Sequence, residues 1–234
     1  MMEAINAAEL VIRVGRHILL DHVSLSVPVG RSVALVGRSA AGKSIFIRVL
    51  LGLFARDEGQ LLVCGLDPEV QPKQVRRLTT YVSEPDVLEP HLTTSQNVAH
   101  IVSLSGLPTP TRVDIARALR DADVPDRVID RPASNLTKHL ALVIWLAIGR
   151  LRGSQLVILD DPTAHLNPSE ASHLASLLRE FAERGPAVFV ATRDERFADE
   201  FASAVYVLES GHFSSRSRSR LTSTPTRTED SGPI

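Results

Sequence analysis

Cysteine and aromatic residues are scarce in this chain, and the scarcity narrows the kind of protein that it encodes. Its single cysteine, Cys64, excludes a disulfide within one chain and fits a reducing compartment. Because Cys64 lies in the apolar stretch LLVCG, we interpret it as a core residue rather than as a reactive thiol. Aromatic residues make up only 4% of the chain, although its hydrophobic content of 44% is ordinary for a globular protein.

An excess of charge and a long hydrophobic run are also missing. The net charge of −1 gives no general attraction to nucleic acid or to anionic lipid, so we predict no nucleic-acid partner. The N-terminal stretch MMEAINAAELVIRV lacks the basic start and long apolar segment of a secretion signal. The longest apolar run, residues 140–148, is too short to cross a bilayer. We therefore expect a soluble, cytoplasmic protein that contacts a membrane only through a partner.

The most informative motif is the stretch GRSAAGKS at residues 37–44, which lies between the apolar stretches SVALV and IFIRVLLGL. The spacing G-x-x-x-x-G-K-S between a strand and a helix is typical of a phosphate-binding loop. Gly37 and Gly42 let backbone N–H groups converge on phosphates, Lys43 brings a positive charge, and Ser44 offers a hydroxyl to Mg²⁺. The alternative, a chance turn rich in glycine and lysine, does not explain the two flanks. The predicted nucleotide-binding residues here are Gly37, Arg38, Ser39, Ala40, Ala41, Gly42, Lys43, Ser44 and Ile45.

The hydrophobic periodicity predicts alternating strands and helices. Strands are expected within residues 9–36, in LLVCG, and at 78–82, 155–159, 187–191 and 204–208. Helices are expected at 44–53, within 93–131, at about 138–150 and at 168–184, with Thr93 or Thr94 and Thr111 as capping residues. Residues 214–234 are rich in Ser, Arg, Thr and Pro and predict a flexible tail. Its arginines either contact an anionic surface or, as we favour, are merely solvated.

Four further segments accompany the phosphate-binding loop in a characteristic order: TYVSEPDVLEPHLTTSQNV, SNLTKHLALVIWLAIGRL, LVILDDPTAHLNP and VFVATRDERFADEFASAVYVLESG. Together, over about residues 8–213, they resemble the ATP-binding-cassette (ABC) ATPase domain. The resemblance implies an α/β P-loop NTPase with a mostly parallel core sheet, an N-terminal antiparallel β subdomain and a helical subdomain at about 93–150. It also implies an ATP-binding domain at residues 1–213, ATP and Mg²⁺ as cofactors, and two cassettes that close head to tail over the nucleotides.

Matched position by position, the resemblance assigns roles at the end of the strand LVILD. Asp160 occupies the position of the family's aspartate that organises Mg²⁺ together with Ser44. The alternative interpretation is that Asp160 belongs to a plain turn at the end of the strand. Asp161 occupies the position of the catalytic glutamate and is one methylene shorter. Because a displacement of ~1 Å in a catalytic group can cost on the order of 100-fold in rate, slow turnover is allowed and fast turnover is not expected.

Two other positions depart from the family pattern. Arg193 replaces the switch histidine; it either clamps the γ-phosphate or is a solvated arginine at the end of a strand. Glu84 replaces the glutamine of the Q-loop, as in cassettes of the ABC-2 exporter branch, and is expected to reach Mg²⁺ or its water. Near Val14, where the family places an aromatic residue on adenine, there is none, so base affinity should be loose.

The signature segment differs most from the family. Where the family has serine, two glycines and glutamine, this chain has Thr137, Lys138, His139 and Leu140. The glycines let backbone approach the partner's γ-phosphate, so we expect the side chains of Lys138 and His139 to fill that space. Lysine could also supply charge to a phosphate. The apolar residues 140–142 indicate either burial against another protein or deeper packing into the chain's own core.

These departures lead to two hypotheses about function. The first is an ATP-binding subunit of an ABC transporter that binds Mg-ATP and hydrolyses it slowly or not at all, with a second ABC ATPase subunit and a transmembrane permease subunit as partners. Asp161 and Arg193 are its candidate catalytic residues, and Ser44, Asp160 and Glu84 are its candidate metal ligands. The second is a non-transport regulatory or scaffolding ATPase of the ABC type.

Overall fold

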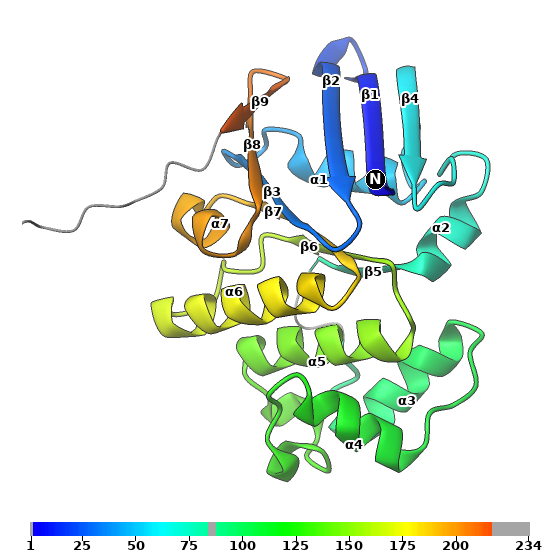
Figure 1. Cartoon of the computed structure of the whole chain (residues 1–234), viewed down its shortest axis with the longest axis vertical. Coiled ribbons are helices and arrows are strands. Elements are labelled where there is room, and N and C mark those ends of the chain that lie inside the picture. Colours follow the sequence, from blue (N-terminus) through cyan, green and yellow to red (C-terminus); the bar gives the residue numbers. More distant parts are fainter. Residues whose placement is uncertain (1, 84–87, 217–234) are drawn as a thin grey trace, which may run out of the picture.

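The computed structural model describes residues 2–83 and 88–216, which form two sheets and a group of helices (Figure 1). An antiparallel sheet has the strand order β2-β1-β4. Its strands are β1 (Glu3–Val14), β2 (His17–Pro28) and β4 (Glu58–Val63). A second sheet has the order β5-β6-β7-β3-β8-β9 and is parallel except for its last strand. Its strands are β3 (Ser32–Gly37), β5 (Thr79–Val82), β6 (Leu156–Asp160), β7 (Ala187–Thr192), β8 (Ala204–Glu209) and β9 (His212–Arg216). The predicted fold class is confirmed.

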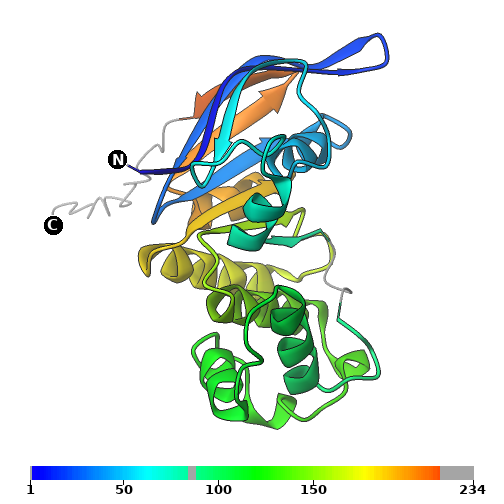
Figure 2. The same cartoon turned by 90° about the vertical axis from the view of Figure 1, so that its right-hand side faces the viewer.

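The helices divide between the sheets and a separate subdomain. They are α1 (Lys43–Leu50), α2 (Pro72–Leu78), α3 (Thr94–Leu104), α4 (Arg112–Arg120), α5 (Lys138–Leu151), α6 (Pro168–Glu183) and α7 (Glu195–Phe201), with short 3₁₀ turns at Asp126–Val128 and Ala133–Asn135. Figures 1 and 2 show α6 and α5 in successive layers below the parallel sheet, with α3 and α4 beyond α5. Thr93 and Thr111 cap α3 and α4 through capping boxes, as the sequence predicts.

Two hydrophobic cores meet at the parallel sheet, because successive side chains of a strand point to opposite faces. On one face, Leu156 and Phe189 of the sheet join Phe46 of α1 and the antiparallel sheet. On the other face, Val157 and Val190 join α5, α6 and the helical subdomain. Burial on both faces explains why the central strands are continuously apolar, and it holds their carboxyl ends, where polar residues follow, in fixed positions.

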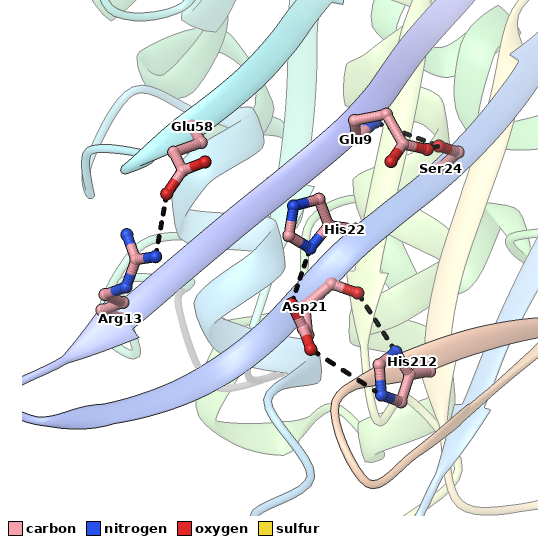
Figure 3. A network of polar contacts seen from close by, with 7 residues as sticks. All are labelled: Glu9, Arg13, Asp21, His22, Ser24, Glu58 and His212. Carbon is pink, nitrogen blue, oxygen red and sulfur yellow. Dashed lines mark hydrogen bonds and ion pairs between the residues drawn. The ribbon is translucent and has the colours of Figure 1, made fainter.

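Contacts between the two sheets tie β2 to the turn between β8 and β9. The backbone N–H of Asp21 donates to the carbonyl of Gly211 (2.9 Å), and His212 Nδ1 donates to the carbonyl of Asp21 (3.1 Å). The carboxylate of Asp21 also contacts His22 Nδ1 (2.7 Å), as Figure 3 shows. Asp21 therefore links the antiparallel sheet to the edge of the parallel sheet.

Some elements differ from the prediction. Residues 214–216, which we assign to the flexible tail from sequence, belong to β9 and pair with β8, so the prediction is wrong for them. The pairing depends on backbone hydrogen bonds along an exposed strand, which leave no apolar pattern. Residues 217–234 lie outside the described part. Cys64 follows β4 in a turn and is half-buried, and burial raises the pKa of its thiol to about 11. Within the described ranges, no helix is long and apolar enough to span a bilayer.

Candidate functional site

The phosphate-binding loop lies at the carboxyl edge of the parallel sheet, between the end of β3 and the start of α1. Gly42 precedes α1 with a φ of 110°, which favours glycine, and a Cβ there would lie 3.1 Å from Leu19 Cγ of β2. Gly37 is required for a different reason, because a Cβ there would lie 2.9 Å from the carbonyl oxygen of Leu208 on β8. Tight packing against β2 and β8 thus accounts for the two glycines of the motif.

Lys43 is the only charged residue among the buried polar side chains of the described ranges, and it lies under this loop with 7% of its surface exposed. Its Nζ donates to the carbonyls of Gly37 (2.7 Å) and Arg38 (2.9 Å). Desolvation lowers the pKa of Lys43, and the carboxylates of Asp161 and Asp160 oppose that shift. A buried ammonium held inside a loop of backbone amides is suited to an anionic phosphate.

Asp160 and Ser44 form the second part of the site. Asp160 is the last residue of β6 and hydrogen-bonds the Ser44 hydroxyl, and burial raises the pKa of its carboxyl. A hydroxyl and one carboxylate suit Mg²⁺, which is usually held by one or two carboxylates plus substrate phosphates. The residues present therefore fit Mg²⁺ bound together with a nucleotide. Within residues 2–83 and 88–216, no group of three or more His, Cys, Asp or Glu residues could hold a metal ion by itself.

Asp161 and Arg193, the two altered catalytic positions, contact each other. Arg193 Nε donates to Asp161 Oδ2 at 2.8 Å, and the pair lies at the adjacent ends of β6 and β7. The Asp161 backbone has a φ of 48°, a left-handed conformation that is uncommon outside glycine, and its N–H donates to the carbonyl of Ala191 (2.7 Å). Arg193 is thus an ion-paired residue, although 53% of its side chain is exposed.

A pocket of about 680 Å³ opens in front of the loop. It is lined by Val36, Gly37, Arg38, Ser39, Ala40, Ala41, Arg193, Glu195, Val207, Leu208, Glu209 and Ser210. Sequence reasoning missed Glu195 and Glu209. Glu195 follows β7, and Glu209 is the last residue of β8. Because β7 and β8 are the two neighbours of β3, the strand order places both residues at this edge.

The remaining predicted residues are placed as follows. Ile45 is partly buried and packs against the core between the two sheets. Val14 ends β1 and is 45% exposed, at the position where the sequence lacks an aromatic residue. Glu84 lies outside the described residues. The structure therefore brings together residues 37–44 with Asp160, Asp161 and Arg193.

The signature segment forms the start of α5. Thr137 caps the helix by accepting from the N–H of Leu140 (3.2 Å). His139 Nε2 lies 3.1 Å from His173 Nδ1 of α6, so the imidazole turns toward α6. That Lys138 and His139 fill the space for a partner's phosphate stays a prediction. Leu142 is 1% exposed and Leu140 is partly buried against the same core. The apolar residues thus pack into the chain's own core, the second of the two alternatives.

Comparison with known proteins agrees with this geometry. A family profile described as "ABC transporter" matches residues 20–164. The Nod factor export ATP-binding protein I of Mesorhizobium japonicum is 27% identical over 84% of this chain. The chain spans 58% of the length of that relative.

Two solved structures have the same fold. The cbiO1 structure from Clostridium perfringens, described as part of the ABC transporter complex cbiONQ, aligns with a TM-score of 0.82 and 20% identity over 92% of this chain and 88% of that one. A dimeric post-hydrolysis structure of the ATP-binding cassette MJ0796, bound to ADP and Pi, aligns with a TM-score of 0.74 and 21% identity over 92% and 99%. With the family profile covering more than half of its length, the chain belongs to the ABC transporter ATP-binding family.

Proposed function

We propose that this chain is the cytoplasmic ATP-binding subunit of an ABC transporter, which binds Mg-ATP and hydrolyses it slowly or not at all. The observation that carries the proposal is the contrast within one site: the phosphate-binding loop is intact, whereas Asp161 is shortened and ion-paired with Arg193.

Binding rests on residues with separate tasks. The backbone of residues 37–42 and the Lys43 ammonium would hold the phosphates, and the start of α1 adds the positive end of a helix dipole. Ser44 and Asp160 would hold Mg²⁺, which supplies positive charge to the phosphate oxygens when bound. Ser39 and Ala40 line the pocket without filling it.

Weak hydrolysis follows from the carboxylate that would have to deprotonate water. Asp161 reaches less far than glutamate, and an arginine that is always cationic already occupies one of its oxygens. A general base contributes typically about 10²–10⁴-fold to rate, so its loss would leave binding intact and turnover slow. Arg193, on the rim of the pocket, is also suited to hold a γ-phosphate rather than to release it.

The partners that we propose are a second ABC ATPase subunit and a membrane permease. The dimeric cassette structure and the export protein among the relatives support this choice. In a homodimer both sites would carry the altered residues. A partner with intact residues would leave each site with part of the alteration, because each nucleotide would lie between the loop of one subunit and the signature segment of the other.

Nucleotide binding is the first prediction to test. Titration calorimetry of the full chain with Mg-ATP should show saturable binding, which Lys43→Ala weakens at least tenfold because the buried ammonium is lost. Lys73→Ala, at an exposed lysine of α2, is the matched control and should bind as the wild type does. Folding of each variant is checked by circular dichroism.

A folded chain that fails to bind Mg-ATP would refute the proposal. A pull-down from the native host then tests the partners. Recovery of a membrane permease supports a transport subunit, whereas recovery from the cytosol without one favours a regulatory ATPase.

A further inference from the structure

Two histidines from different helices face each other beside the signature segment. His139 is the second residue of α5, and its Nε2 lies 3.1 Å from Nδ1 of His173 on α6. The other nitrogen of His173, Nε2, lies 3.5 Å from the carboxylate of Asp123, which follows α4. We call these three side chains the histidine relay. It joins the start of α5 to α6 and to the helical subdomain.

The hydrogen bond between the two imidazole rings needs one proton on the two nitrogens that face each other. When His173 Nε2 carries a proton toward Asp123, its Nδ1 is an acceptor, and the Nε2–H of His139 donates to it. A doubly protonated His173 keeps the contact only when His139 carries its own proton on Nδ1, so that its Nε2 accepts. Protonation of both rings, however, removes the acceptor and places two cations 3.1 Å apart, which breaks the contact.

The surroundings of His139 favour its neutral form. Burial lowers the pKa of this imidazole below its usual 6.5, His173 lowers it further, and Glu170 of α6 opposes the shift. Asp123, the carboxylate of the relay, faces His173, and Lys138 is the neighbour of His139 on α5. The lowered pKa favours the uncharged imidazole of His139 at pH 7.

We propose that His173 positions the signature segment, residues 137–140, by holding the imidazole of His139 against α6, and that acidification releases it. The proposal rests on the proposed function, because only there does this segment face a partner's nucleotide. A released His139 side chain would occupy the space that glycine leaves open in the family. His173 is thus a positioning residue. Because the position of His139 then depends on pH, ATP-driven association of two copies of the chain should depend on pH as well.

The first test follows the segment itself. Hydrogen exchange of the Leu140 and Ala141 amides, both bonded to Thr137, is measured between pH 7.5 and 5.5. Protection factors should fall about fivefold toward pH 5.5 in the wild type, which is the value of one net hydrogen bond of ~1 kcal/mol. In His173→Asn, whose amide oxygen can accept from His139 but is not protonated in this pH range, they should stay constant. His100→Gln, at an exposed histidine of α3, should behave as the wild type does.

The second test follows ATP-driven association in the same variants by analytical ultracentrifugation. The wild type should lose about fivefold more affinity between pH 7.5 and 5.5 than His173→Asn. Equal pH dependence of wild type and His173→Asn in both measurements would overturn the inference. If no variant associates with ATP but exchange at Leu140 follows the prediction, the relay exists and the proposed dimer is wrong.

Discussion

Asp161 and Arg193 are close because β6 and β7 are neighbours in the sheet, although 32 residues separate them in the chain. At the scale of single residues, our proposal of slow hydrolysis depends on this pair. One carboxylate oxygen of Asp161 already accepts from the Arg193 guanidinium, and the side chain reaches less far than that of glutamate.

Asp161→Glu therefore tests the reach of the carboxylate. We expect kcat for phosphate release to rise by roughly 10- to 100-fold, because glutamate restores the missing methylene while keeping the charge. Asp161→Asn, which removes the charge, is the control and should show no rise. An unchanged kcat in Asp161→Glu would assign the slow step to Arg193 or to the absent partner.

Prediction from sequence succeeded where the constraint is local. The glycines of the phosphate-binding loop are dictated by turn geometry and close packing, and the loop forms as expected. The Asp161–Arg193 ion pair could not be predicted, because it depends on strand order and on the left-handed backbone at Asp161. Nor could the rotation of His139 toward α6, which depends on a residue of another helix. The place of Glu84 stays a prediction.

At the scale of elements, α5 connects the signature segment to the core. Its nine consecutive buried residues, 141–149, read as a single apolar run because α3, α4 and α6 surround it. At its far end, Arg152 donates to the carbonyls of Thr79 (3.1 Å) and Arg76 (3.1 Å) and to Thr80 Oγ1 (2.9 Å). This guanidinium joins α5 to α2 and β5.

Removal of the Arg152 side chain should destabilise the protein. Arg152→Ala leaves several carbonyls without a donor in a half-buried place, so we expect the free energy of unfolding to fall by about 3 kcal/mol. Urea unfolding followed by circular dichroism measures the change. Arg179→Ala, at an exposed arginine of α6, should change stability by less than ~0.5 kcal/mol. Equal effects of the two substitutions would show that the Arg152 contacts do not stabilise the fold.

Elements without an apolar pattern were the ones that sequence reasoning missed. α2 has Val75 as its only buried residue, and β9 is exposed at four of its five positions. Their positions are determined by hydrogen bonds and by the strands beside them. The long amphipathic helix α6 and the central strands, in contrast, were predicted within one residue at each end. Periodicity thus predicts elements that build a core and overlooks those that border it.

At the scale of the whole molecule, the site lies where the two sheets meet. Leu19 of the antiparallel sheet covers Gly42, and the turn after β8 borders the pocket. Two hydrophobic cores hold these parts from either side of the parallel sheet, so the phosphate-binding loop has a rigid support. Such an arrangement is suited to hold a nucleotide whether or not its catalytic residues are complete.

Steady-state phosphate release by the full chain at saturating Mg-ATP tests the central claim most directly. Alongside measured ATP binding, our account predicts turnover more than about 100-fold below the ~10 s⁻¹ that is typical of enzymes. Release at about 1 s⁻¹ or faster from the chain alone, abolished by Lys43→Ala, would contradict it.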